Sequence, residues 1–358
     1  YSAEDNASAV DQFKQALEID PNYGRAHAAL SLAYLRGCQL RWNKPLGLSA
    51  GEANAYAMSA LSETKRLPSS LGNVAASGVN LYNSRYDIAK TEATRAIATD
   101  PNDPEAFIAM AWAMTTTGQP ELGLDLIDQA MRLNPTYPSY YVFAQAMAHY
   151  SLGDLEKSAK VLSEALERDP KAEALAIIAA ATYAHLQRFD EAHAALQMAA
   201  PEADQAALGI IAYTYHFPFE WDQKPEIVDS VIEGLHLAAL PPDKPLEYLQ
   251  NRLQTGDTTK RRGAAMILGF SAFSAKETVP LLITALTDES RSVQKQALVS
   301  LGKIGPAAAE ALPIVTEMVG KPVVGRRPKR QWYVQRLNLF TGLSANAAFN
   351  NFCISISE

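Results

Sequence analysis

The sequence predicts an all-α fold, an α-α superhelix of stacked helical hairpins. The first observation is a period: similar helical phrases end at Pro101, Pro135 and Pro170, which lie 34 and then 35 residues apart. The second is that apolar residues recur at helical spacing within each phrase, so that one stripe of each helix is buried. The third is that a fixed period of this length is typical of repeats that bury their apolar faces only by stacking.

The clearest phrase is GDLEKSAKVLSEALERDP, which ends at Pro170. This proline cannot lie inside a following helix, because an internal proline costs about 3 kcal/mol. Before it, Leu155, Ala159 and Leu162 fall on one face of a helix. The phrase therefore predicts a helix over 155–168.

The same reasoning predicts helices along the first part of the chain. Gly118 marks one turn and residues 83–85 mark another, while 37–51 is an insertion that forms a loop or a broken helix. The first helix, 2–19, has no preceding partner, so we expect the chain to be a piece of a longer protein. The predicted helices are 2–19, 24–36, 52–66, 71–82, 86–99, 104–117, 120–133, 138–152, 155–168, 172–187, 190–199, 203–215 and 224–239.

A second repeat begins after the prolines of 241–245, which stop any helix. Four residues there recur 33 positions later, and 307–319 is predicted to be the first helix of a further unit. The sequence thus predicts three parts: 1–240, 241–320 and a basic, poorly patterned tail, 321–358. The recurring residues are Leu253, Ala264, Leu268 and Gly269, followed by Leu286, Ala297, Leu301 and Gly302.

The second helix of each early hairpin carries a small residue, a large residue, an alanine and a proline at fixed spacing. Over roughly 1–200 this spacing resembles that of the tetratricopeptide repeat family. The phrase VPLLITALTDESRSVQKQALVSLGKIG, at 279–305, resembles a HEAT repeat of the short bacterial kind. The spacing is complete at Ala9, Phe13, Ala16 and Pro21, and recurs at Gly123, Ile127, Ala130 and Pro135.

A further resemblance concerns 216–241. This stretch is similar to the segment that closes repeat modules in bacterial multidomain signalling proteins, among them class III nucleotidyl cyclases and winged-helix transcription regulators. In those proteins an effector domain precedes the repeats. The resemblance implies a context for the chain, not an activity.

In the tetratricopeptide repeat family, the first helices of the hairpins line an inner surface that serves as a peptide groove. The resemblance therefore implies a groove of aromatic and polar side chains, which suits a partly apolar peptide or helix. The alternative is that the aromatic side chains pack between neighbouring hairpins. The implied groove residues are Arg25, Arg36, Tyr82, Asn83, Trp112, Thr116, Tyr140, Phe143, Met147, Tyr150 and His185.

The net charge of −7 argues against general affinity for nucleic acid. The charge is uneven: 321–358 carries a net charge of +5, which leaves −12 on the rest. A basic patch in this tail is either a solvated run or a contact for nucleic acid, anionic lipid or an acidic partner. The patch consists of Arg326, Arg327, Lys329 and Arg330.

Two cysteines far apart in sequence cannot form a disulfide framework, which favours a reducing compartment. No signal peptide opens the sequence. The longest apolar run, 174–186, is too short to span a bilayer, so we expect no transmembrane segment. The predicted localisation is cytoplasmic.

No catalytic or metal-binding motif occurs in the sequence. The six histidines lack metal-ligand spacing, and there is no phosphate-binding loop and no nucleophile elbow. The sequence therefore predicts a protein that is not an enzyme and needs no metal or cofactor.

The predicted function is a scaffold that binds a protein or peptide partner, or an upstream domain of the same parent chain. One alternative is the regulatory module of a larger signalling protein such as a class III nucleotidyl cyclase. Another is a tether to nucleic acid or membrane through 321–336.

Overall fold

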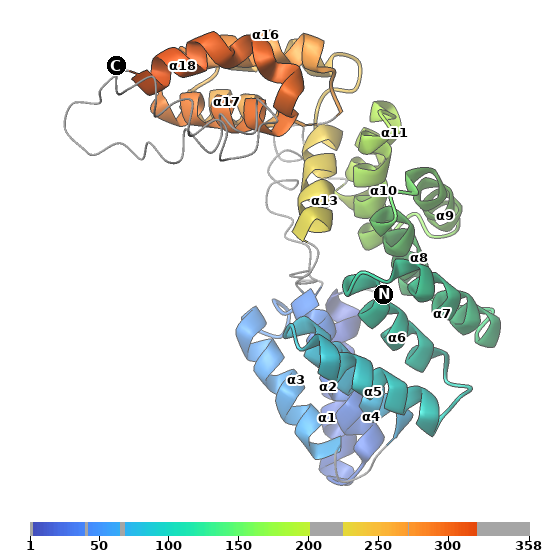
Figure 1. Ribbon diagram of the computed structural model, residues 1–358. Coiled ribbons are helices and arrows are strands. Elements are labelled where there is room, and N and C mark those ends of the chain that lie inside the picture. The colour runs from blue at the N-terminus through green and yellow to red at the C-terminus, as the bar shows by residue number, and fades with distance from the viewer. Residues whose placement is uncertain (1–2, 40–41, 65–68, 201–224, 271, 321–358) are drawn as a thin grey trace, which may run out of the picture. The chain divides into compact units, whose positions relative to one another are not determined.

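The computed structural model describes residues 3–39, 42–64, 69–200, 225–270 and 272–320 (Figure 1). All regular structure in these ranges is helical, with no strand among them. The predicted all-α fold is confirmed.

The helices follow one another with short connections. In the first series the bounds agree with the predicted ranges to within three residues wherever both are described. The first series is α1 (Ala3–Ile19), α2 (Gly24–Gln39), α3 (Ala50–Thr64), α4 (Ser70–Tyr82), α5 (Tyr86–Thr99), α6 (Pro104–Thr116), α7 (Pro120–Leu133), α8 (Ser139–Ser151), α9 (Leu155–Arg168), α10 (Glu173–His185), α11 (Phe189–Ala199) and α13 (Pro225–Ala238). The second is α14 (Pro245–Thr255), α15 (Thr258–Ile267), α16 (Ala275–Ala285), α17 (Arg291–Ile304), the 3₁₀ segment η1 (Gly305–Ala311) and α18 (Leu312–Gly320).

Two sequence predictions need comment. The predicted helix over 203–215 lies outside the described residues. The single helix predicted over 307–319 is wrong in its first half, where the chain forms the 3₁₀ segment before α18 begins. The physical reason is that Gly305 has a φ of 73°, which ends α17, and that Ala308 departs from helical geometry.

The chain divides into two compact units. Unit 1 comprises Tyr1–Leu186 and Ala194–Leu235, and unit 2 comprises Gln187–His193 and His236–Glu358.

The turns of the hairpins in unit 1 use left-handed backbone. Ser84 has a φ of 57°, Gly118 of 86° and Gly153 of 76°. A residue in this conformation ends a helix and reverses the chain, and glycine adopts it without a steric penalty. The positions of Ser84 and Gly118 agree with the turns predicted from sequence.

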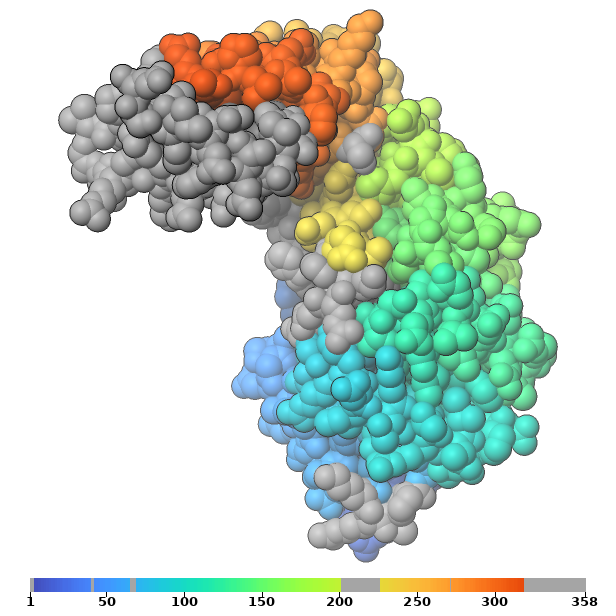
Figure 2. All heavy atoms as spheres, in the orientation of Figure 1, coloured from blue at the N-terminus to red at the C-terminus, as the bar shows by residue number. Residues whose placement is uncertain are grey.

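Unit 1 is built in two layers. The first helices of the hairpins, α2, α4, α6, α8 and α10, contact one another in sequence, and the second helices α3, α5, α7 and α9 each pack against their own first helix (Figure 1). Figure 2 shows the side chains of successive hairpins in continuous contact along the visible face of this unit. The predicted groove residues belong to the first helices of this layer or, for Asn83, to the position just after α4.

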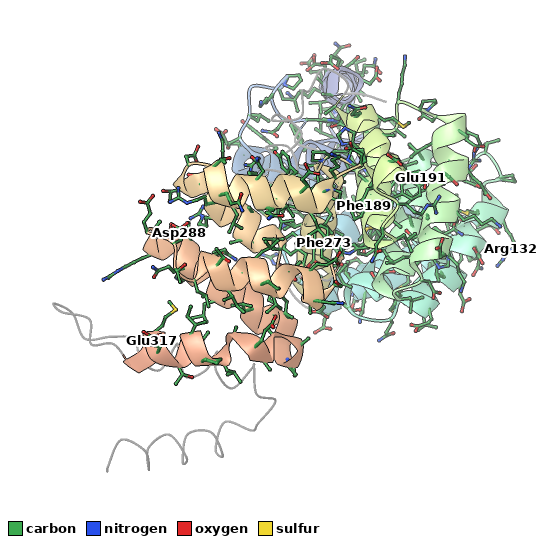
Figure 3. The ribbon with its side chains drawn as sticks, turned by 90° about the horizontal axis from the view of Figure 1, so that it is seen from above. Arg132, Phe189, Glu191, Phe273, Asp288 and Glu317 are labelled. Carbon is green, nitrogen blue, oxygen red and sulfur yellow. The ribbon has the colours of Figure 1, made fainter. Side chains whose placement is uncertain are left out.

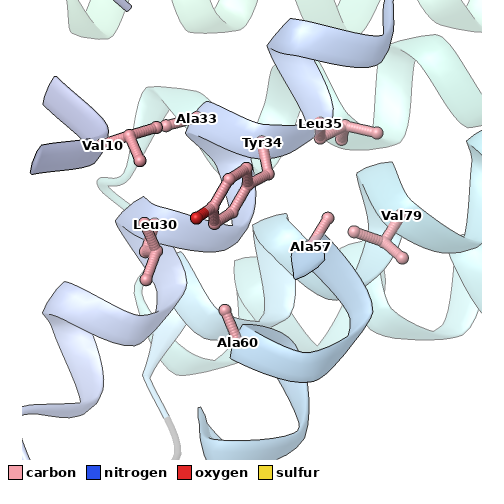
Figure 4. Close-up of a cluster of buried hydrophobic side chains, with 8 residues drawn as sticks. All are labelled: Val10, Leu30, Ala33, Tyr34, Leu35, Ala57, Ala60 and Val79. Atoms are coloured by element: carbon pink, nitrogen blue, oxygen red, sulfur yellow. The ribbon is translucent and has the colours of Figure 1, made fainter. Parts of the chain in front are cut away.

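A core cluster joins α1 to α4 (Figure 4). Val10 from α1 meets Leu30 and Tyr34 from α2, and Ala57 and Val79 complete the contact from α3 and α4. Ala57 is fully buried, so its small side chain permits close approach of the helices. Burial of apolar surface at about 25 cal/mol per Å² stabilises this end of the array.

In unit 2, α15 crosses α17 at small residues. A Cβ added at Gly269, just after α15, would lie 2.8 Å from the Cα of Ser300 and 2.5 Å from its Cβ. The Ser300 hydroxyl donates a hydrogen bond of 2.7 Å to the Ala265 carbonyl. Glycine is therefore needed at this crossing.

Polar and aromatic contacts complete unit 2. The Arg261 guanidinium binds Asp288 at 2.8 Å and Glu289 at 2.9 Å, which joins α15 to the turn before α17. Phe189 and Phe273, both labelled in Figure 3, stack with ring centroids 6.3 Å apart.

One helical stretch among the described residues, Arg291–Met318, is long and apolar enough to cross a membrane by length and composition alone. The 3₁₀ segment interrupts it, so that α17 has 14 residues and α18 has nine. A membrane-spanning helix needs about 20 residues. Neither helix reaches that length by itself.

Candidate partner-binding surface

Successive first helices place equivalent residues in register. α6, α8 and α10 begin at Pro104, Ser139 and Glu173, so a shift of 35 and then 34 residues carries one helix onto the next. Glu105 is thereby equivalent to Tyr140. Trp112 is equivalent to Met147, and Met147 to Ala181.

Arg36, Glu105 and Tyr140 meet although they come from three different helices. The Arg36 guanidinium lies over the Tyr140 ring, 4.9 Å from its centroid. The Tyr140 hydroxyl donates a hydrogen bond to the Glu105 carboxylate. All three side chains are half-buried. A cation over an aromatic face is attractive by about 0.5–1 kcal/mol at exposed sites and by more where water is excluded.

Tyr141 binds the same carboxylate, with a hydrogen bond of 2.8 Å from its hydroxyl to Glu105. The two tyrosine rings touch edge to face at 5.0 Å. Burial, followed by the charge of Glu105, raises the pKa of both tyrosines well above the usual value, while Arg36 opposes this at Tyr140. Both hydroxyls therefore remain protonated donors at neutral pH.

Trp112 extends this arrangement along α6. Its ring lies 5.7 Å from that of Phe143 on α8. Trp112 is half-buried, whereas Phe143, which its ring contacts, is 9% exposed. We call the half-buried set Arg36, Glu105, Trp112 and Tyr140 the aromatic surface.

Tyr82 and Asn83 lie at the end of α4, near the insertion after α2. Asn83 exchanges two amide hydrogen bonds with Asn54 of α3, of 2.9 and 3.1 Å. Tyr82 packs against the cluster shown in Figure 4 and bonds with Cys38. Burial raises the pKa of the Cys38 thiol to about 11, so it stays protonated and unreactive at neutral pH. These contacts join the end of α4 to α2 and α3.

Three further predicted groove residues lie in the interior rather than on an exposed surface. Met147 is fully buried and Tyr150 is 3% exposed. Thr116 is 1% exposed, and its hydroxyl donates a hydrogen bond of 2.8 Å to the Trp112 carbonyl within α6. As with Phe143, the reason is packing by neighbouring helices, which the repeat pattern alone does not reveal.

Tyr150 and His185 both contact α13. The Tyr150 hydroxyl lies 3.0 Å from the Ser230 hydroxyl. His185 Nε2 donates to the Ser230 carbonyl at 2.7 Å. The two rings lie edge to face at 6.1 Å. At this end of the layer a helix of the same chain covers the predicted groove positions.

The remaining predicted residues are placed as follows. Arg25 is exposed near the start of α2, away from the end that carries Arg36. The basic patch of Arg326, Arg327, Lys329 and Arg330 lies outside the described residues. No group of three or more metal-ligating side chains occurs in the part of the chain that the structure describes.

Sequence reasoning missed three contributors to these contacts. Glu105 would have been found by the register, since it lies one repeat before Tyr140. Asn54 and Ser230 stand outside any repeat motif, and no signal in the sequence connects them to Asn83 or His185.

A separate cavity of about 350 Å³ lies among α1, α2, α3 and the insertion. Tyr34 and Tyr56 stack there at 5.3 Å, and Lys14 lies 5.8 Å from the centre of the Tyr34 ring. His27 and Glu63 also line it. The His27 ring is engaged with the Pro21 carbonyl at 2.9 Å.

Two models of known repeat families match parts of this chain. The family model for tetratricopeptide repeats matches 143–207, and the family model for HEAT repeats matches 246–330. No curated protein matches the sequence.

Several solved structures are similar to this chain at low identity. The Cut9–Hcn1 hetero-tetramer of the APC/C matches at 13% identity and a TM-score of 0.48, over 83% of this chain and 52% of that one. This chain thus spans about half the length of that match. TTC0263, a thermophilic TPR protein in Thermus thermophilus, matches at 20% identity and a TM-score of 0.36, over 65% of this chain and 99% of that one. On the evidence of its two family matches and its paired helices, the chain is a helical repeat protein in which a tetratricopeptide repeat match at 143–207 precedes a HEAT repeat match at 246–330.

Proposed function

We propose that the chain is a non-catalytic scaffold that binds a peptide segment of a partner protein on the aromatic surface. The observation that carries the proposal is the convergence of Arg36, Glu105 and Tyr140 on the layer of first helices. Their mutual contacts hold the side chains in place before a partner arrives, so less entropy is lost on binding.

The chemistry of the surface indicates the kind of peptide. Trp112 and Tyr140 offer half-buried aromatic faces, which are enriched among residues that dominate binding energy. Arg36 and Glu105 offer one charge of each sign beside them. A peptide with an apolar or aromatic anchor flanked by polar residues fits this arrangement.

The test is selection of peptides from a random displayed library against the full chain. Enriched peptides are synthesised, and their affinity is measured for the wild type and for the Trp112→Ala/Tyr140→Ala double variant. Loss of two central aromatic anchors is expected to weaken binding by about tenfold or more, or at least about 1.4 kcal/mol.

The matched control is Leu122→Ala on α7, because Leu122 is 51% exposed and stands on a second helix of a hairpin. Its affinity for the same peptides is expected to equal that of the wild type. Peptides that bind the double variant as tightly as the wild type, or a library that yields none, would overturn the proposal.

The remaining features of the proposal follow from the sequence. We place the protein in the cytoplasm and assign it no catalytic role. If the chain is the regulatory module of a larger signalling protein, the partner is a domain of the same parent chain. That domain would bind the same aromatic surface. The basic patch in 321–358 is a second, charge-driven contact in this scheme.

A further inference from the structure

Helix α13 lies directly on the layer of first helices at α8 and α10 (Figure 1). A Cβ added at Gly234 would lie 2.7 Å from the Ala181 carbonyl oxygen and 2.8 Å from the Ala181 Cα. The absence of a side chain at Gly234 thus lets the two helix backbones touch. This contact lies within unit 1.

Polar contacts fix the same helix one turn earlier. Ser230 stands four residues before Gly234, so both lie on one face of α13. The Ser230 backbone carbonyl accepts a hydrogen bond from His185, and its hydroxyl faces Tyr150. The face that contacts α8 and α10 is therefore a Ser-x3-Gly face, with one polar and one steric contact.

Apolar residues beside this face are also buried. Val231 and Leu235 are each 1% exposed, and they follow Ser230 and Gly234 by one position. α13 is amphipathic in this region, because Asp229 is exposed and lies about 200° around the helix axis from the buried Val231. This mode of binding is that of an amphipathic helix on a helical surface, with its contact residues at positions i and i+4.

The register shows which surface α13 occupies. Ala181, which Gly234 touches, is equivalent to Trp112 of the aromatic surface. α13 therefore sits over the continuation of the row of positions that we propose to bind a partner.

We propose that α13 is a self-bound ligand of this surface, and that a partner helix with a Ser-x3-Gly face and flanking apolar residues replaces it. The inference deepens the proposed function and rests on it for the partner, but the docking of α13 itself is testable without one. Displacement of α13 extends the binding surface from Trp112 onto Ala181, Tyr150 and His185.

The experiment uses the full chain and a fluorescent synthetic peptide of residues 225–240. Gly234→Leu introduces a side chain where the Ala181 backbone stands, so α13 is expected to leave its site. Hydrogen exchange of residues 225–235 is expected to rise roughly tenfold or more, while exchange in α6 and α7 is unchanged. The peptide is expected to bind this variant at least about tenfold more tightly than the wild type, whose site is filled.

Two further measurements keep the proposal open to refutation. Tyr150→Phe combined with His185→Ala removes the polar contacts and leaves the steric fit, so hydrogen exchange of α13 is expected to be faster in this variant. It replaces Gly234→Leu as the test if that variant does not fold. A peptide that itself carries the Gly234→Leu change is expected not to bind. Unchanged exchange in both variants, or an exposed site that does not take up the wild-type peptide, would show that α13 is only a packed structural helix.

The outcome is separable from that of the proposed function. Trp112→Ala in the Gly234→Leu background is expected to leave binding of the α13 peptide unchanged, because Trp112 belongs to the preceding hairpins. If library selection yields no peptide for the aromatic surface while the α13 peptide binds, the partner proposal fails and the self-docking proposal stands.

Discussion

At the scale of single residues, the repeat is specified by small side chains at helix contacts. Ala130 on α7 is fully buried in a cluster with Phe107, Ile127 and Tyr141. The sequence placed Ala130 at this tight contact through its spacing from Gly123 and Pro135, and burial confirms that phase. Exposure of Asp128 on the same helix agrees with it.

Ala130→Leu is therefore expected to destabilise the protein. Added methylene groups in a packed contact force neighbouring helices apart, at a cost of about 1–3 kcal/mol. The measurement is the midpoint of thermal unfolding followed by circular dichroism. Asp128→Leu is the matched control and is expected to change the midpoint little, so equal effects of the two changes would contradict the assigned phase.

At the scale of elements, the crossing of α15 and α17 depends on one glycine. The recurrence of residues 33 positions apart marked both Gly269 and Gly302 as repeated positions. It did not show which of the two contacts requires glycine. In the structure Gly269 stands against the backbone of Ser300. Gly263, on α15 itself, has open space around its missing side chain.

The two glycines should therefore respond oppositely to the same change. Gly269→Ala is expected to cost about 1–3 kcal/mol, because the Ser300 backbone cannot move without moving α17. Gly263→Ala is expected to gain about 0.5–1 kcal/mol, since alanine favours a helix interior and meets no neighbour. Urea unfolding of both variants checks this, and a destabilising Gly263→Ala would show that the space is not open.

At the scale of the whole molecule, two histidines with lowered pKa values link stability to pH. In unit 1, burial and then the charge of Lys157 lower the pKa of His149, and one ring nitrogen, Nδ1, is buried without a hydrogen-bond partner. In unit 2, burial lowers the pKa of His236, which packs beside Phe270 at 6.2 Å. Each unit thus holds a histidine that folds in its neutral form.

Stability is expected to fall as the pH drops below about 6.5, the pKa of histidine in an unfolded chain. Between the lowered folded pKa and that value, the unfolded chain binds more protons than the folded one, so acid favours unfolding and the full contribution returns above about pH 6.5. Thermal midpoints measured from pH 5 to 7.5 test this. The thermal midpoint of the His149→Gln/His236→Gln double variant should depend less steeply on pH than that of the wild type. An identical pH dependence would contradict the role given to these two histidines.

The sequence by itself determined the class of fold, the bounds of the described helices in the first series and the phase of the hairpin that contains Ala130. It did so because helical spacing, turn glycines and prolines act over one or two turns of chain, and because a strict period near 34 residues repeats the same local solution. Ala130 and Gly118 were both assigned on that basis. Only the tertiary structure decided which side chains reach the surface. Trp112 and Met147 occupy equivalent positions, yet one is half-buried and the other fully buried, because exposure depends on side chains from neighbouring hairpins. At Tyr150 and His185 it depends on a helix that begins at Pro225.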